Sequence, residues 1–288
     1  MNKMNKKYLF LTLDPNYIRH AAPLVEVFSA TVPHFWTQQA AEVEHQRRIA
    51  VLEATESKTD ASQERYIRLA QKLKDCRNDA PCNSLPCAHC LREYGLTQLA
   101  KRQDFAEDTQ GYTAVTLTFN QTKYDSLWST SRVDEVSRQV SILKQRVSRT
   151  LKRLGYQGPI IGTFMLVRHA FSSKRSRNYW LIQLRLLLPR DNTRLKLLKK
   201  HMARGKGQYI EEVIFNEPIF CSHAKDQAKL LGRVLDLMWY EVACTLSKEG
   251  NRLLKEKPTP LSNKRLANSL VLLDLLGKST MIFHYGAI

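Results

Sequence analysis

The most constraining feature of this sequence is a basic stretch at its centre. Residues 138–206 contain 18 Lys and Arg and a single acid, Asp191, and they carry almost all of the chain's net charge of +18. Cations this dense on one folded unit repel one another unless a polyanion faces them. If the stretch folds with its charges on one surface, it predicts nucleic-acid binding. A solvated basic helix beside an ordinary sheet is the alternative.

The spacing of apolar residues indicates that the stretch does fold. Over Asp134–Leu154 apolar residues recur every three or four positions, and Gly155 follows as a stop, which predicts an amphipathic helix. Two apolar runs, Pro159–Val167 and Tyr179–Pro189, predict the paired strands of a hairpin. A second basic helix is expected over Thr193–Ala203.

The basic side chains of these elements are the candidate nucleic-acid contacts. Because the apolar side of the first helix packs on a core, its other faces, which include Lys144, are available to phosphates. The predicted contacts are Arg138, Arg146, Arg149, Lys152, Arg153, Lys174, Arg175, Arg177, Arg185, Arg194, Lys199, Lys200, Arg204 and Lys206. Phe171, Tyr179 and Trp180 are interleaved with these charges and either stack on unpaired bases or pack the strands.

The composition and the lengths of the apolar runs are typical of a globular protein. With 288 residues, 43% of them hydrophobic, the chain can bury a substantial core. The apolar residues 8–13 are too few for a signal peptide, and no apolar run approaches the ~18 residues needed to span a bilayer. We therefore expect a cytoplasmic protein without a membrane partner, in which the six cysteines do not form disulfides.

The remaining segments predict an α+β fold with helical extensions at both ends. Residues 16–75 are mostly helical in pattern, with a polar break at 57–62. Further predicted elements are strands at 112–119 and 209–215, a long helix from Ser222 to about Ser247, and a Leu-rich helix at 266–276. The expected segments are a helical N-terminal region (1–75), a cysteine loop and connector (76–110), an α+β nucleic-acid-binding domain (111–248) and a C-terminal linker and helix (249–288).

Four of the six cysteines, Cys76, Cys82, Cys87 and Cys90, fall within fifteen residues. This clustering predicts a structural zinc site, since tetrahedral sulfur coordination stabilises loops too small to have a core of their own. The Cys87–Cys90 half has the spacing of a zinc knuckle, whereas the first pair is irregular, and His89 is an alternative ligand. An iron–sulfur cluster or free cysteines are the alternatives to zinc. With four protein ligands, no catalytic zinc is implied.

The order of these parts resembles the rolling-circle replication initiators of plasmids. The resemblance covers roughly residues 63–245. It rests on a helix leading into a Cys-rich loop that ends in Cys-x-x-Cys, then an Ala-Val-Thr-Leu-Thr-Phe strand, a basic helix and a strand reading Trp-Leu-Ile-Gln-Leu-Arg-Leu-Leu-Leu-Pro. It implies a central antiparallel sheet with flanking helices. It also implies nicking of single-stranded DNA by a tyrosine, aided by a divalent metal held by a histidine-hydrophobic-histidine motif on the strand that precedes Leu-Leu-Pro.

The sequence departs from this family at its catalytic positions. The two motif histidines align with Gln183 and Arg185, and a guanidinium has no lone pair with which to bind a metal. Arg185 is instead expected to place a fixed cation beside the phosphate and to hold it without cleavage. The family's tyrosine lies on the helix after the motif, where Tyr240 is the candidate nucleophile.

Together these observations predict a DNA-binding protein that resembles a plasmid or mobile-element replication initiator and has lost metal-dependent nicking. Its expected substrate is single-stranded or hairpin DNA, and its expected partners include replication or mobile-element proteins. One alternative is an active tyrosine nickase with Tyr240 as nucleophile, which would need Mg²⁺ or Mn²⁺ held by diverged ligands such as His169 or His223. The other is an RNA-binding ribonucleoprotein component, because a basic α/β sheet serves RNA equally well.

Overall fold

The structure, a computed structural model, describes residues 37–57, 59–100, 111–124, 130–171, 178–203, 219–222, 232–246, 253–255 and 257–286. The strands are β1 (Tyr112–Tyr124), β2 (Ile160–Phe171), β3 (Tyr179–Pro189), β4 (Ile219–Ser222), β5 (Tyr240–Leu246), β6 (Leu253–Lys255), β7 (Thr259–Pro260) and β8 (Ile282–Tyr285). The helices are α2 (Gln38–Ala54), α3 (Asp60–Lys74), α4 (Ala88–Ala100), α5 (Thr130–Arg153), α6 (Asn192–Ala203) and α8 (Asn263–Met281).

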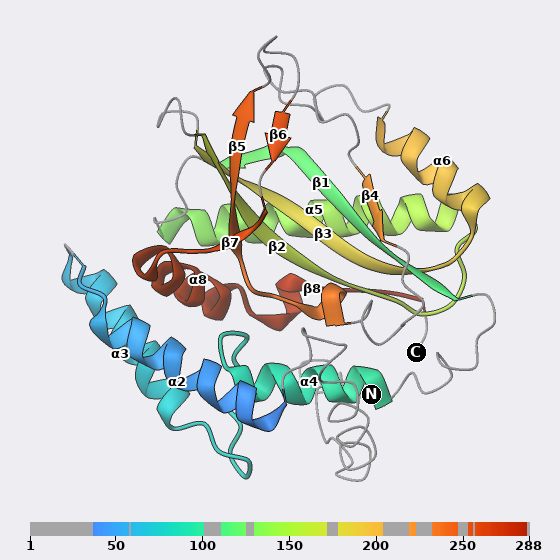
Figure 1. Ribbon diagram of the computed structural model, residues 1–288. Helices are drawn as coiled ribbons and strands as arrows, with labels where there is room; N and C mark the ends of the chain where they lie inside the picture. Colours follow the sequence, from blue (N-terminus) through green and yellow to red (C-terminus); the bar gives the residue numbers. More distant parts are fainter. Residues whose placement is uncertain are drawn as a thin grey trace, which may run out of the picture.

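The centre of the molecule is a β-α-β-β-α-β unit. β1, α5, β2, β3, α6 and β4 follow one another along the chain, and their strands lie in the order β4-β1-β3-β2 with every neighbouring pair antiparallel. This is the arrangement of a split β-α-β fold, in which β3 returns between β1 and β2. Figure 1 shows α5 running across one face of these strands.

The predicted basic helix and hairpin are confirmed. α5 buries an apolar stripe made of Val136, Val140, Leu143, Val147 and Leu151. β2 and β3 pair as antiparallel neighbours, and nearly every residue of both strands is buried. Burial on both faces explains why these strands read as continuous apolar runs and not as alternating ones. The strand predicted at 112–119 and the helices predicted at 193–203 and 266–276 lie within β1, α6 and α8.

The two faces of the sheet follow from the register of its strands, because side chains alternate along each strand. Leu117, Leu184 and Phe164 occupy one row across β1, β3 and β2, and all three are fully buried. The Nζ atom of Lys144, on α5, lies 6.0 Å from the centre of the Phe164 ring, so this row faces α5. The odd-numbered residues of β3 therefore lie on the face away from α5.

The expected central antiparallel sheet is present in β4-β1-β3-β2, but the sheet as a whole is mixed. β5 runs parallel to β2, with Arg168 opposite Glu241 and Phe171 opposite Cys244. β6 and β7 pair with β5, and β8 pairs with β2. β4 and β5 lie at opposite edges of the β4-β1-β3-β2 unit. Because β2 and β5 are far apart in the sequence, they are not limited to the antiparallel pairing that a tight hairpin imposes.

The long helix expected from Ser222 to about Ser247 is wrong over the residues that the structure describes. Only residues 232–235 are helical there, and Tyr240–Leu246 forms β5. Val242 and Cys244 are buried while Glu241 and Ala243 are half-buried, and this alternation is the period of a strand. The apolar residues of β5 fit a helix or a strand equally well, and pairing with β2 decides between them. Tyr240 therefore begins a strand.

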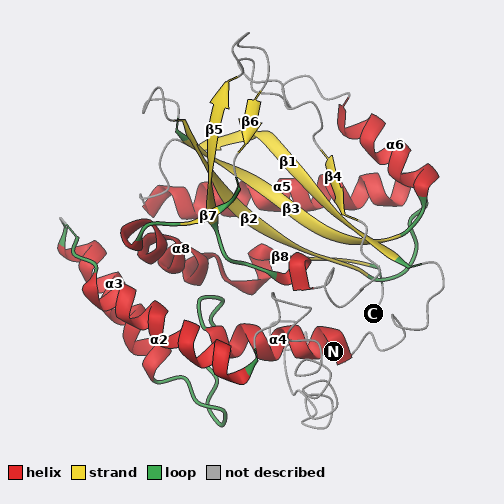
Figure 2. Ribbon diagram, in the orientation of Figure 1, coloured by secondary structure: helices red, strands yellow, loops and turns green. Residues whose placement is uncertain are grey.

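A helical layer made of α2, α3, α4 and α8 lies beside the sheet (Figure 2). α2 packs on α3 and α4, and α8 packs on α2, α3 and α5. One continuous apolar core extends from this layer into the sheet, and α8 and β8 are part of it. The segment boundaries at 75, 110 and 248 remain predictions, and the strand predicted at 209–215 lies outside the described residues.

Candidate metal site and nucleic-acid surface

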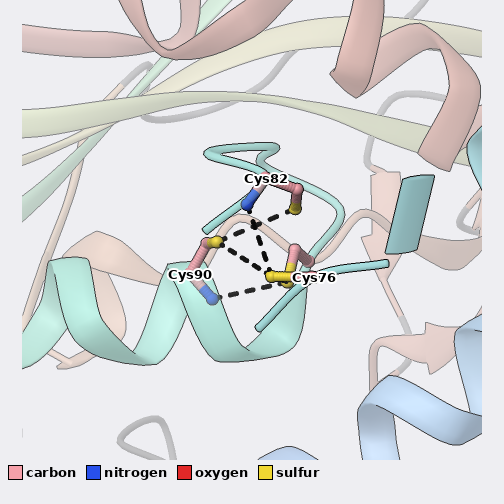
Figure 3. A group of neighbouring side chains, drawn as sticks. Cys76, Cys82 and Cys90 are labelled. Carbon is pink, nitrogen blue, oxygen red and sulfur yellow. Dashed lines mark hydrogen bonds between the residues drawn. The ribbon is translucent and has the colours of Figure 1, made fainter. Parts of the chain in front are cut away.

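Three elements bring the four cysteines together. Cys76 follows the end of α3, Cys82 lies in the loop, Cys87 immediately precedes α4 and Cys90 lies in the first turn of that helix. Their Sγ atoms all lie within 4.8 Å of one another. Figure 3 shows Cys76, Cys82 and Cys90 turned toward one another. The predicted cluster of four sulfur ligands is therefore present, and it is able to hold a metal ion.

The sulfur–sulfur distances fit tetrahedral coordination. They are 3.5 Å for Cys76–Cys87, 3.6 Å for Cys76–Cys90 and 3.8 Å for Cys82–Cys90. Four sulfurs at ~2.3 Å from one ion would be about 3.8 Å apart, whereas a disulfide requires about 2.05 Å. The backbone N–H groups of Cys82 and Cys90 also donate to the Sγ atoms of Cys76 and Cys87, at 3.4 and 3.5 Å.

Without a cation, the cysteines share their protons unequally. Hydrogen bonds from Cys87 and Cys90 lower the pKa of Cys82 to about 2. The same contacts with Cys82 raise the pKa of Cys90 to about 12, and they also raise the pKa of Cys87. One thiolate is thus stabilised by its neighbours, but four are not. Binding of a metal ion to all four sulfurs would therefore release protons.

Several polar side chains lie around the cysteines and make hydrogen bonds or ion pairs there. His89, the alternative ligand, lies with its Nε2 atom 3.2 Å from a carboxylate oxygen of Glu42. The Arg48 guanidinium, which is almost fully buried, donates to the carbonyl oxygen of Pro86 at 2.6 Å, one residue before Cys87. Lys278 also lies near the sulfurs. Its pKa is lowered, because the effect of burial exceeds the opposing effect of the cysteines. Both cations would offset the negative charge of a loaded cluster.

A second candidate site is a basic surface on the outer faces of α5 and α6. The Thr150 hydroxyl on α5 lies 3.2 Å from His201 Nε2 on α6, so the C-terminal half of α5 and α6 are neighbours. The α5–α6 basic surface consists of Arg138, Arg146, Arg149, Lys152, Arg153, Arg190, Arg194, Lys196 and Lys200. Within the described residues from 138 to 203, Asp191 is the one acid, and that carboxylate already pairs with Arg194 at 3.5 Å. The surface therefore has a strong positive field.

Several predicted contacts lie elsewhere. Lys174, Arg175, Arg177, Arg204 and Lys206, and the side chain of Lys199, lie outside the described residues. Lys144 turns away from the basic surface, and its Nζ atom donates to the carbonyl oxygens of Ser279 and Ile282 at 2.6 Å each. Phe171, Tyr179 and Trp180 are buried, so the packing interpretation of these aromatic residues is correct for the described structure.

The positions aligned with the initiator motif meet Tyr240 on the face of the sheet away from α5. The Tyr240 hydroxyl lies 3.4 Å from the Arg185 guanidinium and 3.5 Å from Gln183 Oε1. Arg185 also donates to the carbonyl oxygen of Arg233 at 3.0 Å and lies 3.6 Å from Asp236 Oδ2. The tyrosine and the two motif positions therefore do converge in space. The cation of Arg185 is, however, partly neutralised by an internal carboxylate.

This second cluster, Gln183–Arg185–Tyr240, has no set of ligands for a divalent metal among the described residues. The four cysteines are the one group of three or more metal-binding side chains found in that part of the chain. His169 is fully buried, with its ring stacked on Tyr179 and its Nδ1 atom 3.5 Å from Cys244 Sγ. His223 lies outside the described residues.

Sequence reasoning missed Arg48 and Asp236. Arg48 follows Arg47 on a helix with several charged residues, so its sequence context indicates a solvated side chain. Asp236 lies in a segment predicted to be helical, and only the fold brings it to Arg185. Neither residue belongs to a motif, so no pattern in the sequence identifies them.

Comparison of the chain with protein-family models, with curated proteins and with solved structures gave no match. Functional inference therefore rests on the geometry above. Among the described residues, no helix is both long enough and apolar enough to cross a membrane.

Proposed function

We propose that this chain is a nucleic-acid-binding protein that holds single-stranded or hairpin DNA on the α5–α6 basic surface. The observation that carries the proposal is the joining of two basic helices into one surface, where Asp191, the one acid of the described residues between 138 and 203, is already paired. Phosphate contacts supply most of the affinity in such complexes, and a field of this sign also speeds association.

Charge-neutralising variants test this proposal. The triple variant Arg149→Gln/Lys152→Gln/Arg153→Gln removes three exposed cations from the end of α5. If each contacts a phosphate, the plot of log binding constant against log salt concentration becomes less steep by about 2 to 3 for a DNA hairpin. Fluorescence anisotropy measures the binding constants. The control Arg68→Gln/Lys74→Gln/Lys264→Gln removes the same charge from exposed positions on α3 and α8. Equal slopes for the two variants would refute the proposal.

The preference for DNA over RNA is a separate part of the proposal. An RNA hairpin of matched sequence differs in its A-form helix and its 2′-hydroxyl groups. A surface that binds DNA makes no contacts that depend on these features. We expect the DNA hairpin to compete more strongly than the RNA hairpin in the same anisotropy assay. Stronger competition by RNA would favour the ribonucleoprotein alternative.

We further propose that the protein binds DNA without cutting it, as the resemblance to plasmid replication initiators with an altered motif implies. Arg185 and Gln183 occupy the motif positions, and the nearby Asp236 carboxylate is used by Arg185. The specific observation that favours the nickase alternative is the contact of Tyr240 with both motif positions. Incubation with circular single-stranded DNA and Mn²⁺ separates the two. A covalent adduct that disappears in Tyr240→Phe would establish the nickase.

We propose that the cysteine cluster holds structural zinc. The support is the tetrahedral spacing of four sulfurs and the absence of a free coordination position for substrate in a four-sulfur site. Elemental analysis of protein purified without added metal is expected to give one zinc per chain. Iron with visible absorbance would instead indicate an iron–sulfur cluster.

A further inference from the structure

The four-cysteine loop and the Tyr240 segment are connected through one buried side chain. The Arg48 guanidinium donates to Glu44 at 2.8 Å, to the Pro86 carbonyl oxygen at 2.6 Å and to Met238 Sδ at 2.7 Å. Pro86 precedes Cys87, and Met238 lies two residues before Tyr240. A single guanidinium thus joins α2, the cysteine loop and the segment that leads into β5.

The contacts continue from Met238 to Tyr240. The Met238 N–H donates to Asp236 Oδ1 at 3.0 Å, and the other oxygen of that carboxylate lies 3.6 Å from Arg185. Arg185 in turn lies 3.4 Å from the Tyr240 hydroxyl. Segment 233–240 therefore has supports on two sides. Arg48 holds it at the cysteine loop, and Arg185 holds it at the sheet.

We propose that occupancy of the cysteine site by a metal ion positions the segment 233–240, with Arg48 as the positioning residue. This inference rests on the proposed metal site and is independent of nucleic-acid binding. A bound ion fixes Cys87 and with it the Pro86 carbonyl group that Arg48 needs as an acceptor. Loss of the ion frees the loop, so a buried guanidinium loses one partner and its hold on Met238 weakens.

Hydrogen–deuterium exchange on the full chain tests the connection. Removing the metal with a chelator is expected to speed exchange by about tenfold or more both in residues 76–91 and in residues 232–246, while β1–β3 stay protected. Re-addition of Zn²⁺ restores both segments. The inference would be overturned by fast exchange confined to residues 76–91, or by an equal rise in exchange rate across the chain, β1–β3 included.

Two variants isolate Arg48 from the metal. Arg48→Lys keeps the charge beside Glu44, but a compact ammonium does not span the Pro86 and Met238 groups. We expect this variant to retain its metal and a protected cysteine loop, with fast exchange in 232–246. Met238→Ala, at a half-buried position, removes the same contact from the other side and should give the same pattern if Arg48→Lys does not fold.

The control is Lys72→Met, which breaks the ion pair of Lys72 with Asp274 at 2.6 Å. Asp274 also accepts a hydrogen bond from Ser84 at 2.5 Å, so this variant disturbs a different support of the cysteine loop. Exchange in 232–246 should stay as slow as in the unmodified protein. A chain that neither contains nor takes up metal would overturn the inference and the zinc proposal together. A metal-loaded chain with slow exchange in 232–246 for both Arg48→Lys and Met238→Ala overturns the inference alone.

Discussion

At the scale of single residues, Arg185 shows how a local environment changes an expectation drawn from an alignment. The motif position predicts a cation for a phosphate, but the side chain is only 17% exposed and lies beside Asp236. Its guanidinium also donates to a backbone carbonyl group. Arg185 therefore acts first on the stability of segment 233–240.

We predict that Arg185→Ala destabilises the fold more than it weakens DNA binding. The variant leaves the half-buried Asp236 without this partner, which costs about 1–3 kcal/mol in the free energy of unfolding. Chemical denaturation measures this loss, and anisotropy measures the affinity for the DNA hairpin. Arg149→Gln, on the exposed side of α5, is the matched control and should show the opposite pattern. A large loss of affinity in Arg185→Ala with unchanged stability would restore the phosphate-binding role.

At the scale of elements, the contact between α5 and α8 depends on a lysine predicted to face phosphates. Lys144 donates to the carbonyl oxygen of Ser279, in the last turn of α8, and to that of Ile282, which begins β8. Burial lowers the pKa of Lys144 to about 8 from its usual 10.5. An amphipathic pattern shows which face of a helix is apolar, but it does not show which polar side chain bends back to a neighbouring helix.

This pKa predicts a pH dependence of stability. Because the lysine is protonated more readily in the unfolded chain than in the folded one, the unfolded state binds more protons between pH 8 and pH 10.5. Stability contributed by this group therefore rises with pH in that window. The difference in unfolding free energy between the unmodified protein and Lys144→Met should move in favour of the unmodified protein from pH 8 to 10. A difference that stays constant, or moves the other way, would contradict this.

At the scale of the whole molecule, the core is continuous across all the segments that the sequence suggests. α8 packs on α2, α3 and α5, and β8 extends the sheet beside β2. The basic surface and the Gln183–Arg185–Tyr240 cluster lie on different sides of the sheet, because α5 covers the face opposite to the odd-numbered residues of β3. DNA bound on α5 and α6 would therefore not reach Tyr240 by the same contacts.

We predict that the C-terminal segment is required for folding. A chain ending at Pro260 lacks α8 and β8, and it exposes their large apolar partners on α5, α2, α3 and β2. It should lose cooperative thermal unfolding and the near-ultraviolet circular dichroism of packed aromatic residues. The control ends at Tyr285 and keeps both elements. A cooperative transition in the shorter chain would show that the segment is a true appendage.

The sequence by itself determined the elements whose patterns are local. The stripe of α5, the apolar runs of β2 and β3, and the grouping of four cysteines each follow from spacing over a few residues. Tertiary structure alone decided that residues 240–246 form a strand, because their apolar run fits either period and only pairing with β2 selects one. It also decided the contacts of Arg48 with Met238, of Arg185 with Asp236 and of Lys144 with Ile282, because these partners lie far away in the sequence. Burial gives such charges their roles, and burial is a property of the assembled chain.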